Sequence, residues 1–230
     1  MQGLTVAFGA VKALTGVDLQ LRRGEIRGLI GPNGAGKSTL IDALTGFLPE
    51  HGGRISVGGE AIDRLPPHRV ARVGLRRTFQ QDRVPSTLTV GAYVRFVARG
   101  KASPETIDQA LAYLGCPPPA TALQNVDVGT RRVIEVAANL AARPLVLMLD
   151  EPAAGLSHEE HLAFADRLRG IPEHFGTTLL IVEHDLDLVR SVCTSVTVLD
   201  FGEVLASGTA EEVLADPRVA RAYMGEEELL

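Results

Sequence analysis

The sequence has few cysteines and no long hydrophobic run, and each shortage excludes a class of protein. Its two cysteines, Cys116 and Cys193, lie far apart and fit no metal-binding spacing. We therefore expect reduced, structural thiols in a cytosolic protein, and neither a disulfide framework nor a zinc site. No stretch reaches about 18 uncharged apolar residues, so no segment is predicted to span a bilayer. The N-terminus has no basic stretch followed by an apolar core, so we expect no secretory signal.

Basic residues are also too few to mark a nucleic-acid-binding protein. The chain of 230 residues carries 23 lysines and arginines against 28 aspartates and glutamates, a net charge of −5. No long basic run stands out, so we predict no nucleic-acid partner. A hydrophobic content of 45% is ample for a core. The length suits one large α/β domain or a core with a smaller inserted part.

The most informative segment is a glycine-rich loop directly after the apolar run Ile26–Ile30. It fits G-x-x-x-x-G-K-[ST], in which glycines let consecutive N–H groups point at phosphate oxygens. Lys37 adds a positive charge, Ser38 a hydroxyl that ligates magnesium, and a helix predicted over Lys37–Leu44 adds its dipole. The alternative is a glycine-rich turn without a ligand. The predicted phosphate-binding residues are Gly31, Pro32, Asn33, Gly34, Ala35, Gly36, Lys37, Ser38 and Thr39.

Two acids follow a run of five apolar residues, Leu145–Leu149, which is typical of a central parallel strand. The carboxyl ends of parallel strands face the ligand crevice, so we expect both acids beside the phosphate loop. Asp150 is placed to hold magnesium, and Glu151 to orient or deprotonate a water that attacks the γ-phosphorus. An acidic strand end that only caps a helix is the alternative.

His184 and Gln80 each follow a predicted strand, Leu179–Val182 and Leu75–Phe79. The imidazole can donate a hydrogen bond to a γ-phosphate oxygen, although a lone histidine after a strand is more often structural. The amide of Gln80 can coordinate magnesium and the attacking water, with the neighbouring Gln81 as its competitor.

Phe8 precedes the core and can stack on a purine, or it is a buried core aromatic. Farther along, His51–Gly59 is predicted to be one strand bounded by turns. From residue 82 to 142 strand-like runs disappear and helical spacing takes over. We therefore predict one domain over residues 1–230, with a core from 1–81 and 143–230 and a helical subdomain at 82–142. Strands alternating with helices in the core indicate a doubly wound α/β sheet.

Together these motifs resemble the nucleotide-binding subunit of ATP-binding-cassette (ABC) transporters, across essentially the whole chain. The matching motifs are Walker A at Gly31–Ser38, the Q-loop at Gln80, Walker B at Leu145–Asp150 and the switch histidine His184. The resemblance implies a P-loop NTPase core with a mainly parallel sheet, N-terminal antiparallel β strands and an inserted helical subdomain. It also implies ATP and Mg²⁺, a second ATPase subunit, membrane permeases at the cytoplasmic face of the cell membrane and, indirectly, a solute-binding protein.

Three further segments resemble the ATPases of importers for branched-chain or hydrophobic amino acids, although importers of urea or other polar solutes use similar subunits. These segments are Gly74–Gln80, Asp150–Leu156 and Ala222–Gly225.

One motif departs from the family. Its signature, typically L-S-G-G-Q, aligns with Val126–Thr130, where Gly129 alone matches and Asp127 replaces serine. In the family this segment binds the γ-phosphate held by the other subunit, which assigns Asp127 and Gly129 to nucleotide binding. Two unit charges about 4 Å apart repel by on the order of 4 kcal/mol at a dielectric near 20. Either Asp127 turns away to cap the following helix, or this half-site is weak.

Three functions remain to be weighed. The leading one is an ATPase that powers import as a head-to-tail pair of subunits. The second is a regulatory nucleotide-binding subunit that hydrolyses little at the site its Asp127 completes and works in a heterodimer. A cassette ATPase acting on DNA or ribosomes is disfavoured, because such chains usually carry coiled coils or two cassettes and this chain is acidic.

Overall fold

A six-stranded sheet lies at the centre of the protein, in the order β11-β10-β3-β9-β8-β7. The computed structural model describes residues 1–79, 84–99 and 102–224. Five strands run parallel, and β11 returns antiparallel beside β10. This arrangement confirms the predicted α/β class with its mainly parallel sheet. The strands are β3 (Ile26–Ile30), β7 (Leu75–Arg77), β8 (Val146–Asp150), β9 (Thr178–Val182), β10 (Ser195–Asp200) and β11 (Glu203–Gly208).

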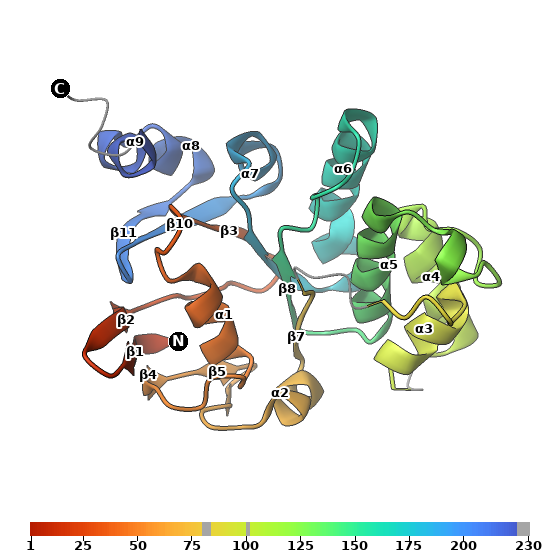
Figure 1. The fold of residues 1–230 in the computed structure, drawn as a ribbon, viewed down its shortest axis with the longest axis horizontal. Coiled ribbons are helices and arrows are strands. Elements are labelled where there is room, and N and C mark those ends of the chain that lie inside the picture. The colour runs from red at the N-terminus through yellow and green to blue at the C-terminus, as the bar shows by residue number, and fades with distance from the viewer. Residues whose placement is uncertain (80–83, 100–101, 225–230) are drawn as a thin grey trace.

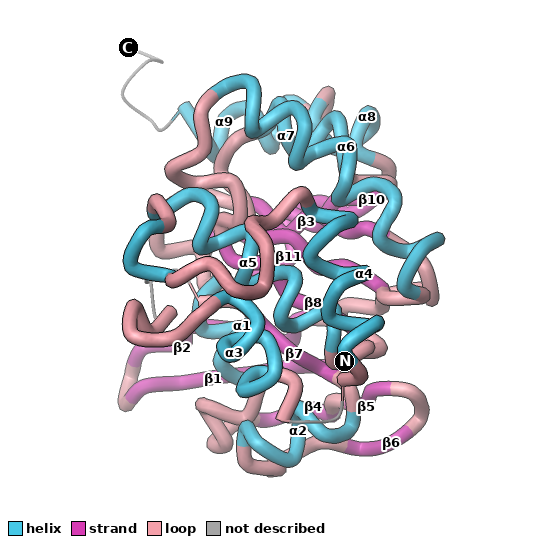
Figure 2. The backbone as a smooth tube through the Cα atoms, turned by 90° about the vertical axis from the view of Figure 1, so that its right-hand side faces the viewer, coloured by secondary structure: helices cyan, strands magenta, loops and turns pink. Residues whose placement is uncertain are grey.

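Helices connect these strands and cover both faces of the sheet (Figures 1 and 2). The residues at their ends are typical of helix N-termini. Pro66 and Pro67 open α2, and Ser157 forms a reciprocal capping box with Glu160 at the start of α6. The helices outside the 82–142 segment are α1 (Lys37–Leu44), α2 (Pro67–Val73), α6 (His158–Phe175), α7 (Leu186–Val192), α8 (Ala210–Leu214) and α9 (Pro217–Met224).

The described residues between 84 and 142 form helices that lie together on one side of the molecule (Figure 1). α3 and α4 both pack against α5, and buried apolar residues such as Leu111 and Ile134 lie between them. α4 ends at Gly115, which adopts the left-handed conformation typical of a helix C-terminus. The elements are α3 (Val90–Val97), α4 (Pro104–Leu114), the 3₁₀ helix η1 (Leu123–Asn125) and α5 (Val128–Ala141).

The central sheet is buried on both faces, because successive residues of a strand point into different hydrophobic cores. In β8, Leu147 and Leu149 belong to the core that includes α5, α6 and α7, whereas Met148 belongs to the core that includes α1. β9 contains no exposed residue. Such strands need apolar side chains at every position, which is why their unbroken apolar runs identify them in the sequence.

The N-terminal strands form a separate antiparallel sheet in the order β2-β1-β4, next to a two-stranded ribbon of β5 and β6. The prediction of one strand over residues 51–59 is wrong, because β4 and β5 belong to different sheets. Between them Ile55 is buried, and its N–H donates to the Asp63 carboxylate instead of a strand. β7 likewise ends at Arg77, two residues before its predicted end. The N-terminal strands are β1 (Gln2–Phe8), β2 (Val11–Val17), β4 (Gly52–Arg54), β5 (Ser56–Val57) and β6 (Glu60–Ala61).

Asp127 caps the N-terminus of α5. Its Oδ1 accepts a hydrogen bond from the Thr130 N–H at 2.8 Å, and its Oδ2 accepts one from the Thr130 hydroxyl at 2.6 Å. These bonds hold the pKa of the Asp127 carboxyl below its usual value, so the group stays charged where the helix dipole favours an anion. The structure therefore shows the capping contacts expected for Asp127, and the strength of the half-site stays a prediction.

We predict that Asp127→Ala lowers the free energy of unfolding by about 1 kcal/mol, because Thr130 loses its capping acceptor. Asp127→Ser keeps an acceptor and should stay within a few tenths of a kcal/mol of the wild type, on the order expected among good caps. Urea unfolding of the three proteins measures the difference. Equal losses in both variants would show that the cap does not stabilise α5.

Candidate functional site

The loop between β3 and α1 approaches other backbone so closely that two of its positions admit only glycine. Gly31 leaves β3 with φ of 150°, and a Cβ there would lie 2.1 Å from the Leu199 carbonyl oxygen. Gly36 has φ of 101°, and a Cβ there would lie 2.8 Å from the Ala13 carbonyl oxygen. Gly36 is also the N-cap residue of α1, so the unpaired N–H groups of the first helical turn belong to this loop.

Lys37 folds back onto the loop that carries it. Its ammonium donates to the carbonyl oxygens of Gly31 at 2.6 Å and Pro32 at 2.9 Å. Burial lowers the pKa of Lys37, and the nearby carboxylates of Glu151 and Asp150 oppose this shift. Among the residues that the structure describes, Lys37 forms no ion pair, so an anionic ligand can recruit its ammonium by replacing the carbonyl oxygens.

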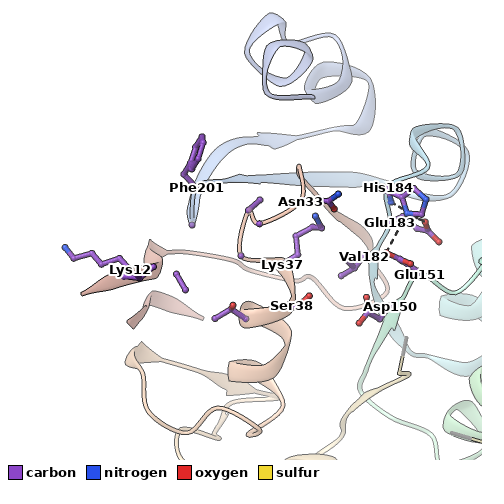
Figure 3. Close-up of a pocket in the computed structure, with 17 residues that line it drawn as sticks. Lys12, Asn33, Lys37, Ser38, Asp150, Glu151, Val182, Glu183, His184 and Phe201 are labelled. Atoms are coloured by element: carbon purple, nitrogen blue, oxygen red, sulfur yellow. Dashed lines mark hydrogen bonds and ion pairs between the residues drawn. The ribbon is translucent and has the colours of Figure 1, made fainter. Parts of the chain in front are cut away.

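A cavity of about 730 Å³ opens beside this loop. Figure 3 shows Lys37 between the acids and His184 on one side and Lys12 and Phe201 on the other. The predicted residues from Asn33 to Thr39 therefore meet Asp150, Glu151 and His184 around one space, whereas Gly31 and Pro32 do not line it. The lining residues are Val11, Lys12, Ala13, Asn33, Gly34, Ala35, Gly36, Lys37, Ser38, Thr39, Asp150, Glu151, Val182, Glu183, His184, Phe201 and Gly202.

Asp150 ends β8 next to the loop. Its N–H donates to the Thr78 hydroxyl at 3.2 Å, which ties the end of β8 to the residues after β7. Burial raises the pKa of the Asp150 carboxyl, although Arg77 lowers it. A cation bound beside this carboxylate would favour its charged form, so the site is suited to a metal.

Glu151 adopts a conformation that is rare for a residue with a side chain, with φ of 48°. Two backbone hydrogen bonds hold it there: its N–H donates to the Val182 carbonyl at 2.9 Å, and its carbonyl accepts from Arg132 of α5 at 2.9 Å. Strained backbone of this kind persists where the surroundings fix it, and it clusters at functional sites. The carboxylate of Glu151 is thereby turned into the cavity.

His184 lies directly after β9, and its Nδ1 is 3.7 Å from Glu151 Oε1. Its side chain is 71% exposed, so the imidazole is free to meet a ligand. Behind it, Glu183 is 3% exposed and accepts a hydrogen bond from the His184 N–H at 3.3 Å. Burial raises the pKa of Glu183. The sequence does not single out Glu183, since nothing there separates a buried carboxyl from a solvated one.

Phe8 is not among the residues that line the cavity. It lies at the end of β1, 55% exposed, and its partner across the hairpin, Val11, does line the cavity. Phe201, which sequence reasoning missed, is an 89% exposed lining residue in the turn between β10 and β11, with φ of 43°. The signal available for it was an aromatic residue beside a glycine at a predicted strand end. The stacking role of Phe8 stays a prediction.

The remaining predicted residues are Gln80, Asp127 and Gly129. Gln80 lies outside the described residues. Asp127 and Gly129 lie at the N-terminus of α5 and do not line the cavity. Gly129 instead packs against the loop after β8, where a Cβ would lie 2.7 Å from the Gly155 carbonyl oxygen.

The cavity fits a nucleoside triphosphate with magnesium. The loop amides, the first turn of α1 and Lys37 are donors and positive charge for phosphates, and Ser38 and Asp150 are oxygen ligands. Magnesium commonly binds one or two protein oxygens together with substrate phosphates and water. Such a site needs no dense ligand cluster, and within residues 1–79, 84–99 and 102–224 no group of three or more His, Cys, Asp or Glu could hold a metal.

Comparison with known sequences agrees with this chemistry. The profile of the family described as "ABC transporter" matches residues 14–154, more than half of the chain, and that of "Branched-chain amino acid ATP-binding cassette transporter" matches residues 203–228. The chain is 36% identical to the high-affinity branched-chain amino acid transport ATP-binding protein LivG of Salmonella typhimurium, over 98% of this chain and 97% of that protein. It is 34% identical to BraF of Pseudomonas aeruginosa, with the same coverage.

Solved structures give the same result for the fold. The ADP conformation of MJ1267, an ATP-binding cassette of an ABC transporter, superposes with a TM-score of 0.85 at 28% identity, covering 98% of this chain and 97% of that one. A nucleotide-free ATP-binding cassette from an ABC transporter superposes with a TM-score of 0.83, also at 28% identity and with 98% of each chain covered. The chain therefore belongs to the ABC transporter family, as one of its ATP-binding cassettes.

Proposed function

We propose that this chain hydrolyses ATP to power the uptake of branched-chain or hydrophobic amino acids. The convergence of Lys37, Asp150, Glu151 and His184 around one cavity carries the proposal, since these groups come from three separate segments. The names of the relatives and the profile matched at residues 203–228 support the amino-acid substrate.

The roles of the residues follow from their chemistry. The loop residues Gly31–Thr39 bind and orient the triphosphate, with Lys37 leaving its carbonyl partners for phosphate oxygens. Ser38 and Asp150 hold Mg²⁺, together with Gln80. The metal, when bound, neutralises charge on the phosphate oxygens. Glu151 orients the attacking water and accepts its proton, and His184 donates a hydrogen bond to the terminal phosphate.

The helical segment 82–142 is connected to both sides of the site. The Phe79 N–H, next to Gln80, donates to the buried Glu135 carboxylate of α5 at 3.0 Å, and Arg132 of α5 binds the Glu151 carbonyl. Polar contacts therefore link both Phe79 and Glu151 to α5. We propose that this segment meets the membrane permeases.

The ATPase would reach the membrane through those partners. Across the described ranges, no helix has both the length and the apolar character needed to cross a bilayer. We propose a peripheral position at the cytoplasmic face of the cell membrane, bound to permease subunits, with a solute-binding protein delivering the amino acid from the other side.

The second ATPase subunit would complete the nucleotide site. Asp127 and Gly129 do not line the cavity of their own chain, so they can contact a nucleotide there only if another subunit presents them. The pair is a homodimer or a heterodimer.

A regulatory role in a heterodimer is the second candidate, and the carboxylate of Asp127 favours it. A half-site completed by a negative charge would bind ATP and turn it over slowly, while a partner with serine at this position would complete the stronger site. The capping hydrogen bonds of Asp127 favour the first candidate.

We predict that Glu151→Gln lowers kcat for ATP by at least about 10²-fold, the scale of general base catalysis, because an amide cannot accept the proton of the water. ATP affinity should change little, since the phosphate-binding residues are intact. Phosphate release and equilibrium binding of ATP measure the two effects, with the exposed Glu60→Gln of β6 as the matched control. Full turnover in Glu151→Gln would remove Glu151 from the reaction.

The ATPase rate of the purified chain without a partner, measured for the wild type and for Asp127→Ser, tests the role of Asp127. If its carboxylate faces the helix it caps, Asp127→Ser should change the ATPase rate by less than about threefold, which is under 1 kcal/mol in activation free energy. A rise of tenfold or more in the serine variant, from a slow wild type, would instead support the regulatory heterodimer.

Base stacking is tested by Phe8→Ala. Stacking on an aromatic ring is worth about 1–3 kcal/mol, so we expect ATP affinity to fall roughly fivefold or more. Inorganic triphosphate has no base, and its affinity should not change. Phe201→Ala is the competing variant, and a loss confined to it would assign the stacking to Phe201.

A further inference from the structure

The C-terminal helix α9 touches the phosphate loop through one hydrogen bond. The N–H of Gly31, the first residue of the loop, donates to the hydroxyl oxygen of Tyr223 at 2.7 Å. The two residues are 192 positions apart. The roles proposed above for the loop do not need this contact.

The sheet leaves the Gly31 N–H without a strand partner. β3 pairs with β9 as far as Leu29 and with β10 as far as Ile30. The chain then turns at Gly31, where the Leu199 carbonyl lies too close for any side chain. A buried N–H without an acceptor is costly, so the Tyr223 hydroxyl takes the place of the next strand residue.

Gly31 is held from its other side by the lysine of the loop. Its carbonyl accepts the Lys37 ammonium at 2.6 Å, while its N–H is bound to Tyr223. The orientation of this residue therefore sets where the loop leaves the sheet and where Lys37 rests. A tilt at Gly31 would displace every following amide of the loop.

α9 is itself fixed well enough to hold the hydroxyl in place. Val219, one turn before Tyr223 on the same face, is 2% exposed, and the helix packs against α8 and β11. Asp216 accepts the Arg218 N–H at 2.8 Å at the start of the helix. Burial raises the pKa of Tyr223, so the phenol keeps its proton at neutral pH. Figure 1 shows α9 beside α8, above β11.

We propose that Tyr223 is a positioning residue for the phosphate loop, so that the C-terminal helix sets the fraction of molecules whose loop is ready to bind ATP. The proposal rests on the proposed function, because it concerns the same site. Tyr223 lies within residues 203–228, the segment that the branched-chain transporter profile matches, so the proposal gives this segment a role in ATP binding. Tyr223 acts through Gly31 and touches no substrate.

The test is Tyr223→Phe, which keeps the ring and removes the acceptor. Apparent affinity falls in proportion to the competent fraction, whereas saturating ligand restores that fraction. Loss of one hydrogen bond to a buried N–H therefore predicts a rise of roughly fivefold to tenfold in KM and Kd for ATP. The kcat at saturating ATP should stay within about twofold, since the ready state itself is unchanged. Hydrogen exchange at the Gly31 amide should become faster.

Tyr113→Phe is the matched control. The hydroxyl of Tyr113, a partly buried residue of α4, donates to the Arg167 backbone carbonyl of α6 at 2.7 Å, and Tyr113 does not line the cavity. Removal of the Tyr113 hydroxyl should leave the KM for ATP unchanged, even if the variant has a lower melting temperature. A general loss of stability would affect both variants alike and would not separate KM from kcat.

The outcomes distinguish this inference from the function on which it depends. Wild-type protein that binds no ATP in the presence of Mg²⁺ would overturn the proposed function. Wild-type protein that binds ATP, together with a Tyr223→Phe variant whose KM and Gly31 exchange match it, would overturn the inference alone. A fall in kcat with unchanged KM would also overturn it.

Discussion

The phosphate loop keeps its shape because backbone meets backbone where no side chain fits. Gly31 lies against the Leu199 carbonyl, and Gly36 lies against the Ala13 carbonyl. Between them the Ala35 carbonyl accepts the Gly202 N–H at 3.1 Å, and the Gly202 carbonyl accepts the Thr15 N–H at 2.9 Å. The β1–β2 hairpin and the β10–β11 turn therefore hold the Gly36 end of the loop before any ligand arrives, and Tyr223 holds the N–H of Gly31 at its other end. A cradle fixed in this way loses little conformational entropy on binding phosphate.

The positions of the acids and of His184 depend on a second constraint, which is the order of the parallel strands in the sheet. β3, β9 and β8 are neighbours, so their carboxyl ends bring the loop, His184 and Glu151 to one edge of the sheet. Glu151 has left the strand, and its rare conformation is fixed by Val182 of β9 and Arg132 of α5. The residue proposed as the base is thus tied to both the core and the helical segment. The hydrogen bond from Arg132 is a contact through which α5 holds the Glu151 backbone.

The sequence predicted the cavity residues that directly follow a buried parallel strand. Lys37, Asp150 and His184 each follow a buried strand, and parallel strands must end at the same edge. Phe201 and Tyr223 were not predictable, because their contacts depend on how a turn and a terminal helix pack against a loop far away in the chain. The single strand predicted over residues 51–59 failed for a similar reason: only tertiary pairing shows that Ile55 separates two sheets.

The cost of the carboxylate at Asp127 depends on how strongly solvent screens its repulsion from a phosphate. The repulsion of about 4 kcal/mol applies to two charges about 4 Å apart at a dielectric near 20, and in bulk water it falls to about 1 kcal/mol. Asp127 is exposed, and both of its oxygens accept hydrogen bonds from Thr130. The positive end of the α5 dipole offsets part of its charge. The smaller penalty therefore describes this carboxylate better.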